Sequence, residues 1–400
     1  MYKIILTGKY LATPWEIPST IRFSQLVQAI QDRKKIAVLL YEQSDTSTFR
    51  YRAYNIHKSL LQSEEWRAVY FFKDEMDRLR RYLDRIHLLV VIRFRWCPEL
   101  DLFMNRTRAN AVPILFDIDD LVFDVRYIPL VTNTLNVGMK SEEDNNYWFS
   151  YVSRLGFAAS FADGFTTTNP YLGNLLTQTF AKPTRIIRNA INDEQFHVSK
   201  RCLQAKQSQK SSRPFVIGYF SGTPSHINDF SLIYMEILQL LREFKDISLM
   251  VVGFMEFPAE LQAFIDSGRI KYVPLVDFIE LQRLIAEVDV NISPLVTNTF
   301  TNCKSELKFF EAALVKTITL STPTYTFQNC ITDGVNGFLC RQGEWYSKIK
   351  ALYLRQYPID EINESAFQYA VKRYYGDDVR KEIEACYNHA IGEQTSSDHG

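Results

Sequence analysis

The chain has 400 residues, of which 46% are hydrophobic and 14% aromatic, and its 46 basic and 46 acidic residues cancel to a formal net charge of zero. This composition excludes a disordered protein, and the balanced charge gives no overall attraction to nucleic acid, so we expect no nucleic-acid partner. The length exceeds what one hydrophobic core usually organises, which predicts two domains of comparable size.

No apolar stretch approaches the length needed to cross a bilayer, and the apolar run near the first residue is too short for a secretory signal. We therefore expect a cytoplasmic protein. Its six cysteines are scattered, without the paired spacing of zinc or redox sites, so reduced thiols and no bound metal are expected. They are Cys97, Cys202, Cys303, Cys330, Cys340 and Cys386.

Apolar strands and amphipathic helices alternate through the first half of the chain. The first strand is expected at 35–41, where the continuous apolar run KIAVLLY is typical of a strand that is buried on both faces. This pattern predicts an α/β domain with a doubly wound parallel sheet. Further strands are expected at 68–72, 87–94, 112–116, 164–168 and 184–187, a helix at 19–30, and an inserted loop at 126–146.

The loop after the first strand carries Arg50 and Arg52 into a helix, beyond the strand's carboxyl end, where ligands gather in a parallel sheet. We interpret both arginines as acceptor-side or phosphate contacts, with solvated helix charges as the alternative. A later predicted helix, 73–85, has an arginine-rich side interleaved with acids. That side is either a solvated face or a peripheral contact with anionic membrane headgroups.

The sequence Asp117-Ile118-Asp119-Asp120 ends another predicted strand. Clustered carboxylates suit a hard divalent cation, so one hypothesis is a metal-dependent phosphotransferase that uses Asp117 and Asp119. A carboxylate that caps the next turn is the structural alternative.

The second half has two strands that end in polar loops. The strand at 215–220 runs into Ser221-Gly222-Thr223, where Gly222 gives the backbone freedom to approach a ligand. The strand at 288–296 leads into a loop and then a helix, which either Asn302 or Ser305 would cap.

The start of that helix predicts an anion site. Free N–H groups at a helix N-terminus, together with Lys304 and Lys308, suit a phosphate, and Glu311 further along the helix suits vicinal hydroxyls. A surface amphipathic helix with solvated charges is the alternative.

In their order along the chain, these pieces resemble the donor-site signature of family 4 retaining glycosyltransferases, also called glycosyl transferases group 1, which have the GT-B fold. They read Ser293-Pro294, the loop to Lys304, Glu311-Ala312 and Asp333-Gly334-Val335-Asn336-Gly337. The resemblance implies two Rossmann-like doubly wound domains that face a central cleft. It also implies that Glu311 holds the ribose of a nucleotide sugar, with Ser293 and Ser305 in the donor half.

The chain departs from the family pattern in the same region. The family has an earlier Glu, separated from the second by seven residues, and Cys303 stands at that position. Glu306 is one candidate for its role toward the donor sugar. The family's phosphate loop corresponds to Gly222, Thr223 and His226 but lacks the basic pair that usually follows, so Lys304 or Lys308 is expected to supply the positive charge.

On the first-domain side, the resemblance directs the strand end with Asp119 and Asp120 toward the cleft, where either residue would orient the acceptor hydroxyl. The run Arg188-Asn189-Ala190-Ile191-Asn192 is similar to the family's Pro-Asn-Gly-Val-Asp at the domain junction, which puts Asn189 on the acceptor side.

The domain boundaries follow from composition and from the resemblance. We expect an acceptor-side domain at 1–196, a linker at 197–213, a donor domain at 214–360, helices crossing back to the first domain at 361–390, and a disordered tail at 391–400.

The implied activity is transfer of a sugar from a nucleotide-diphosphate sugar to a hydroxyl of a glycan or lipid-linked glycan, with retention at the anomeric carbon and without a metal or other cofactor. Two alternatives stay open: a catalytically silent glycosyltransferase-like binding subunit, and the phosphotransferase described above. The sequence does not specify the donor's base or sugar, the acceptor, the oligomeric state or the role of residues 1–30.

Overall fold

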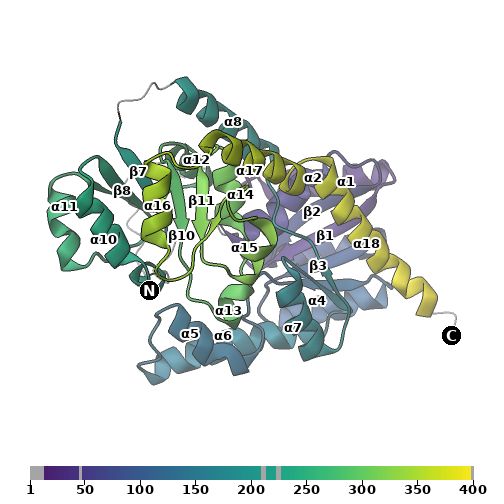
Figure 1. Ribbon diagram of the computed structural model, residues 1–400. Coiled ribbons are helices and arrows are strands. Elements are labelled where there is room, and N and C mark those ends of the chain that lie inside the picture. The colour runs from purple at the N-terminus through teal and green to yellow at the C-terminus, as the bar shows by residue number, and fades with distance from the viewer. Residues whose placement is uncertain (1–12, 45–46, 209–212, 222–226, 398–400) are drawn as a thin grey trace.

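The computed structural model describes residues 13–44, 47–208, 213–221 and 227–397. It contains two six-stranded sheets, each with all of its paired strands parallel and with helices around it (Figure 1). We call the part that is built on the first sheet the first lobe and the part that is built on the second sheet the second lobe. The expectation of an α/β fold with two doubly wound sheets is confirmed.

The strand order of the first lobe is β2-β1-β3-β4-β5-β6, and that of the second is β12-β11-β10-β7-β8-β9. The first-lobe strands are β1 (Lys35–Tyr41), β2 (Trp66–Phe72), β3 (Leu88–Ile92), β4 (Ile114–Asp117), β5 (Gly164–Thr167) and β6 (Thr184–Ile186). The second-lobe strands are β7 (Phe215–Phe220), β8 (Ile247–Val252), β9 (Ile270–Val273), β10 (Val290–Ser293), β11 (Ile318–Ser321) and β12 (Phe338–Leu339).

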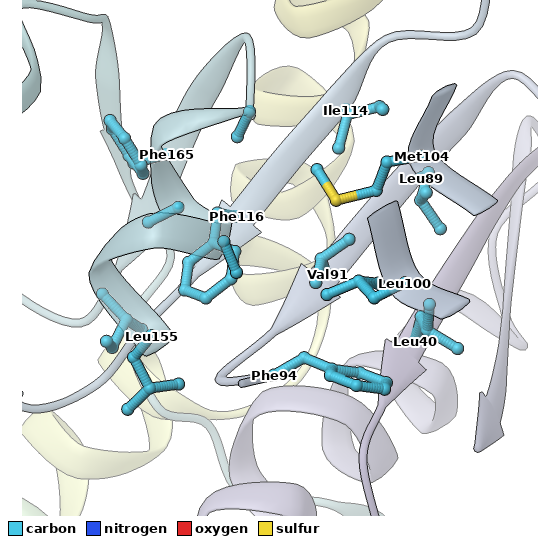
Figure 2. Close-up of a cluster of buried hydrophobic side chains, with 14 of the residues drawn as sticks. Leu40, Leu89, Val91, Phe94, Leu100, Met104, Ile114, Phe116, Leu155 and Phe165 are labelled. Atoms are coloured by element: carbon cyan, nitrogen blue, oxygen red, sulfur yellow. The ribbon is translucent and has the colours of Figure 1, made fainter. Parts of the chain in front are cut away.

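Strand β1 shows why the sequence forms this sheet. Ile36, Val38 and Leu40 join the hydrophobic cluster on one face, part of which Figure 2 shows, while the residues between them join the cluster on the other face. Successive side chains of a strand point to opposite faces, so every side chain of a strand that is covered on both sides is buried, and apolar residues are favoured at each position. The continuous apolar run is therefore explained by burial on both faces.

Helices cover both sheets. Up to residue 208 they are α1 (Ser19–Gln31), η1 (Arg50–Tyr54), α2 (Asn55–Leu60), η2 (Lys73–Glu75), α3 (Met76–Leu79), η3 (Arg80–Arg85), α4 (Pro98–Ala109), η4 (Val125–Tyr127), α5 (Ile128–Thr134), α6 (Glu142–Ser160), α7 (Pro170–Phe180) and α8 (Asp193–Ser208). From residue 227 they are α9 (Ile227–Ser231), α10 (Tyr234–Glu243), η6 (Ala259–Leu261), α11 (Gln262–Asp266), α12 (Phe278–Ala286), α13 (Thr299–Asn302), α14 (Leu307–Ala313), α15 (Tyr325–Cys330), α16 (Trp345–Tyr353), α17 (Ile359–Tyr374) and α18 (Asp377–Ser397).

The last two helices join the lobes. Helix α17 packs on α14 of the second lobe, and α18 lies against α2 and β3 of the first lobe (Figure 1). The α18 residues Val379, Ile383 and Tyr387 are buried in the same first-lobe cluster as Trp66. The first lobe is thus completed by a segment that lies far from it in sequence.

Several boundaries differ from the sequence expectation. Residues 193–208 form α8, which packs on α12, so most of the expected linker is a helix. Most of the helix expected at 73–85 consists of two 3-10 segments flanking the short α3. The expected loop at 126–146 contains α5 and the start of α6, which Ser141 caps together with Asp144. Helix α18 continues to Ser397, so the residues up to that point in the expected tail are helical.

Candidate functional site

The donor-like segment forms two short helices instead of one. Asn298 caps α13 by accepting a hydrogen bond from the Thr301 N–H at 3.0 Å. The two caps expected from the sequence have other partners: Asn302 accepts from the Tyr325 N–H at 2.9 Å, and the Ser305 hydroxyl accepts from the Asn189 amide at 3.0 Å. The break between the helices lets residues 303–306 follow the boundary between the lobes.

Lys308 lies in the first turn of α14, and its ammonium is buried. The Nζ atom has no hydrogen-bond partner among the described residues and lies 5.5 Å from the centre of the Tyr219 ring. Burial lowers the pKa of Lys308 to about 8, although the charge of Asp229 acts in the opposite direction. A buried cation without acceptors is costly, so this position favours an anionic ligand.

Lys304 links the second lobe to the first. Its Nζ lies 3.8 Å from an oxygen of Asp120, which follows β4. Arg93 donates to Asp119 at 3.0 Å and to Asp120 at 3.2 Å, and the Thr48 hydroxyl donates to Asp119 at 2.9 Å. Burial raises the pKa of Asp119, against the influence of Arg93. The structure therefore brings both aspartates and Lys304 to one place at the lobe junction.

Glu311 is buried and accepts hydrogen bonds from the first lobe and from α8. Its carboxylate accepts from the Tyr51 hydroxyl, from Arg50 at 3.4 Å and from the Gln195 amide at 3.5 Å. Burial raises the pKa of Tyr51, so its hydroxyl keeps the proton that it donates. Arg50, expected as an acceptor-side residue, is itself buried and faces Glu311.

Arg52 holds the first lobe together. It is fully buried and donates to both oxygens of Asp117, at 2.8 and 2.6 Å, to the Ile187 carbonyl at 2.6 Å and to Asn189 at 3.1 Å. Arg52 and Asn189, both expected on the acceptor side, are thus engaged with other groups of the protein, Asn189 also through its bond to Ser305. The two oxygens of Asp117 are committed to Arg52, and one of them also accepts from Thr166 at 2.6 Å.

Cys303 is completely buried and packs with Phe300 in a hydrophobic cluster of the first lobe. Its carbonyl accepts from the Asn169 amide at 2.8 Å. Burial and the nearby Asp120 raise the pKa of the thiol, so it stays protonated. The thiol therefore marks the place next to Asp120 where the family pattern has its first Glu.

Glu306 and Ser293 are placed differently from each other. The Glu306 carboxylate accepts from the Tyr374 hydroxyl of α17 at 2.8 Å, and burial raises its pKa. The Glu306 carboxylate therefore faces α17. The Ser293 hydroxyl is buried at the end of β10 without a partner among the described residues. Gly222, Thr223 and His226 lie outside the described residues.

Sequence reasoning missed Arg93, Tyr151 and Asn169. Arg93 directly follows β3 and adopts a left-handed backbone with φ of 40°, a conformation that is uncommon outside glycine. Its Nε donates to the Tyr151 hydroxyl at 3.1 Å. The available signal was an arginine at the carboxyl end of an apolar strand, the position where ligands bind in parallel sheets.

Across the described ranges, no three His, Cys, Asp or Glu side chains are grouped so that they could hold a metal ion. The same part of the chain contains no helix that combines the length and apolarity of a membrane span.

Comparisons with known proteins agree with this architecture. Residues 214–354 match the sequence model of the family Glycosyl transferases group 1. A search of curated protein sequences gives no significant match.

Solved structures are similar over nearly the whole chain. Anabaena Alr3699/HepE in complex with UDP has 13% identity, with 89% of this chain and 100% of that chain covered and a TM-score of 0.56. Sucrose-phosphate synthase from Thermosynechococcus elongatus has 11% identity, coverage of 90% and 100%, and a TM-score of 0.56. A glycosyltransferase from Rickettsia africae ESF-5 has 12% identity, coverage of 89% and 99%, and a TM-score of 0.56.

The chain therefore has the GT-B fold. Its second lobe also carries the sequence pattern of group 1 glycosyltransferases, over the segment that contains Lys304, Lys308 and Glu311. The resemblance recognised in the sequence is confirmed at that level.

Proposed function

We propose that the protein transfers a sugar from a nucleotide-diphosphate sugar to a hydroxyl of a glycan or lipid-linked glycan, with retention at the anomeric carbon. One observation carries the proposal: the buried ammonium of Lys308 has no hydrogen-bond partner among the described residues, and it lies near Lys304, which reaches Asp120 of the other lobe. This arrangement offers positive charge to a diphosphate beside carboxylates that can face a hydroxyl.

The chemistry needs stabilisation of the leaving diphosphate more than it needs a strong base. Lys304 and Lys308 would neutralise the charge that develops on the β-phosphate, where such charge stabilises the transition state. Asp119 or Asp120 would orient the acceptor hydroxyl. The departing phosphate can take the acceptor's proton on the same face of the sugar, so the step needs no metal or other cofactor.

The finer assignments belong to the same proposal. We assign the protein to family 4 and to a role in polysaccharide or glycoconjugate biosynthesis in the cytoplasm, with the arginine-rich side of segment 73–85 as a peripheral contact for an anionic membrane. Uridine diphosphate is the first nucleotide to test, because the Anabaena relative was solved with UDP.

The lysine pair provides the direct test. Lys304→Ala combined with Lys308→Ala should lower turnover of a UDP-sugar at least roughly a hundredfold, as is typical when transition-state charge loses its partner. Mass spectrometry of the products from a panel of nucleotide sugars measures this. Lys271→Ala is the matched control, because Lys271 is an exposed lysine of the same lobe. Full turnover in the double variant would place the phosphate contacts elsewhere.

A catalytically silent binding subunit is the second candidate. Two observations favour it: Cys303 occupies the place of the first family Glu, and Glu311 is already bonded to Arg50 and Tyr51. Tight UDP binding without turnover of any donor, tested with several acceptors, would support this candidate.

The phosphotransferase alternative has less support, because both oxygens of Asp117 are bonded to Arg52. Activity that is lost on chelation and restored by magnesium would revive it.

A further inference from the structure

Helix α6 presents aromatic side chains beside the proposed site. Tyr147 is 57% exposed, and its ring stacks on that of Tyr151 with 6.0 Å between centroids and an interplanar angle of 9°. Trp148 packs edge-on against both rings. We call the stacked pair Tyr147 and Tyr151 the tyrosine platform.

The platform is connected to the site by hydrogen bonds. The Tyr151 hydroxyl accepts from Arg93 at 3.1 Å, and the same arginine donates to Asp119 and Asp120. A ligand whose reacting end met the aspartates could therefore extend along α6 toward Tyr147.

A cavity whose lining includes several charged residues is connected to the platform through Arg95. Arg95 is an electrostatic neighbour of both tyrosines and donates to Glu42 at 2.9 and 2.5 Å. Glu42 in turn lines a cavity of about 570 Å³ at the ends of β1 and β2, together with Phe72, Lys73 and Glu99. The cavity and the platform are thus linked through one ion pair.

These features fit a carbohydrate. A sugar ring has an apolar C–H face, which can lie on an aromatic ring, and a rim of hydroxyls, which can bond to carboxylates and guanidinium groups. An anionic membrane is disfavoured, because Glu142, Glu143 and Asp144 form the first turn of α6 beside Tyr147.

We propose that the tyrosine platform is an acceptor subsite, which holds a sugar residue behind the one that receives the transferred group, so that the acceptor is a chain of at least two sugars. This inference rests on the proposed function. The exposed Tyr147 supplies the stacking surface, and Arg95 and Glu42 bind the hydroxyls of the same chain.

The test compares Tyr147→Ala with Phe157→Ala. Phe157 is the matched control, because it is an aromatic residue of α6 that is 51% exposed and packs against Trp96 instead of the platform. Labelled full-length protein with UDP present is applied to an array of oligosaccharides, and the glycan bound best is then titrated. Tyr147→Ala should weaken its binding by roughly three- to tenfold, which is the effect of one aromatic contact. Phe157→Ala should leave it unchanged, and Tyr147→Trp should retain it.

The other outcomes would overturn the inference. They are unchanged glycan affinity in Tyr147→Ala, an equal loss in Phe157→Ala, no bound glycan for the unmodified protein, or loss of binding to phosphatidylglycerol vesicles in Tyr147→Ala while glycan binding stays intact. UDP affinity is measured on every variant. Failure of the unmodified protein to bind UDP would count against the proposed function, whereas normal UDP binding with no effect at Tyr147 would count against the platform alone.

Discussion

The ammonium of Lys308 makes nucleotide binding dependent on pH. Its pKa of about 8 means that the free protein loses this charge as the pH rises through 8. A bound diphosphate favours the charged form and raises the pKa again. We therefore expect UDP affinity to fall as the pH rises through 8, with protons taken up on binding. Titration calorimetry in two buffers of different ionisation enthalpy measures the uptake.

Substitution of Lys308 distinguishes the effect of its charge from that of the neighbouring Lys304. Lys308→Met should abolish the pH dependence, whereas Lys304→Met should retain it. The pKa of Lys308 in the folded protein lies below the ordinary lysine pKa of 10.5, so protonated Lys308 destabilises the fold at neutral pH, and this penalty decreases as the pH rises from 8 toward 10.5. Lys308→Met should therefore raise the melting temperature at pH 7. Proton uptake that persists in Lys308→Met would contradict the assignment.

At the scale of elements, α18 stabilises the first lobe through Tyr387. The ring is completely buried and packs edge-on against Trp66 at 5.5 Å, but its hydroxyl has no partner among the described residues. Tyr387→Ala should lower the free energy of unfolding by about 3–5 kcal/mol through the cavity that it leaves. Tyr387→Phe should be neutral or stabilising, because it removes a buried polar group that lacks a partner.

Urea denaturation of the full chain measures both Tyr387 variants. A loss in Tyr387→Phe as large as that in Tyr387→Ala would mean that the hydroxyl has an acceptor, and that α18 is held by this bond and not by packing.

Buried elements could be predicted from the sequence better than exposed ones. Strand β1 was predicted with its observed bounds, because a run with no polar position can only be buried on both faces. Helix α8 was missed because it is rich in lysine and glutamine, and few of its residues, such as Gln195 and Ser199, are buried. The break between α13 and α14 is set by the contacts of Cys303 and Ser305 with the other lobe, which local sequence does not encode.

The sequence could name candidate site residues where a residue type implies one chemistry. The sequence picked out Lys304, Asp119 and Asp120, which the structure brings together at the lobe junction. It did not show that Arg52 and Asn189 are used internally, because only the fold reveals that Asp117 and Ser305 lie within reach of them.

At the scale of the whole molecule, Glu311 holds the lobes in contact through Tyr51. If Glu311 binds the ribose, this contact competes with the nucleotide. Tyr51→Phe removes the hydroxyl but keeps the ring on Phe310, so it should raise UDP affinity roughly three- to tenfold, the equivalent of one net hydrogen bond. Fluorescence titration with UDP measures the change.

Tyr54→Phe is the matched control, because Tyr54 belongs to the same helical segment but donates to Glu194. If Tyr51→Phe left UDP affinity unchanged while Glu311→Ala lowered only the melting temperature, Glu311 would be a structural link between the lobes and not a ribose ligand.

The return of α18 to the first lobe has a consequence for synthesis of the protein. A ribosome finishes the strands of the first sheet roughly 10–40 s before it makes residues 377–390, given an interval of roughly 200 residues. During that time the face around Trp66 lacks the side chains that cover it in the finished molecule. The nascent chain should therefore bind a chaperone at this face, and the amino-terminal half should become resistant to protease only after the carboxyl-terminal helix has emerged.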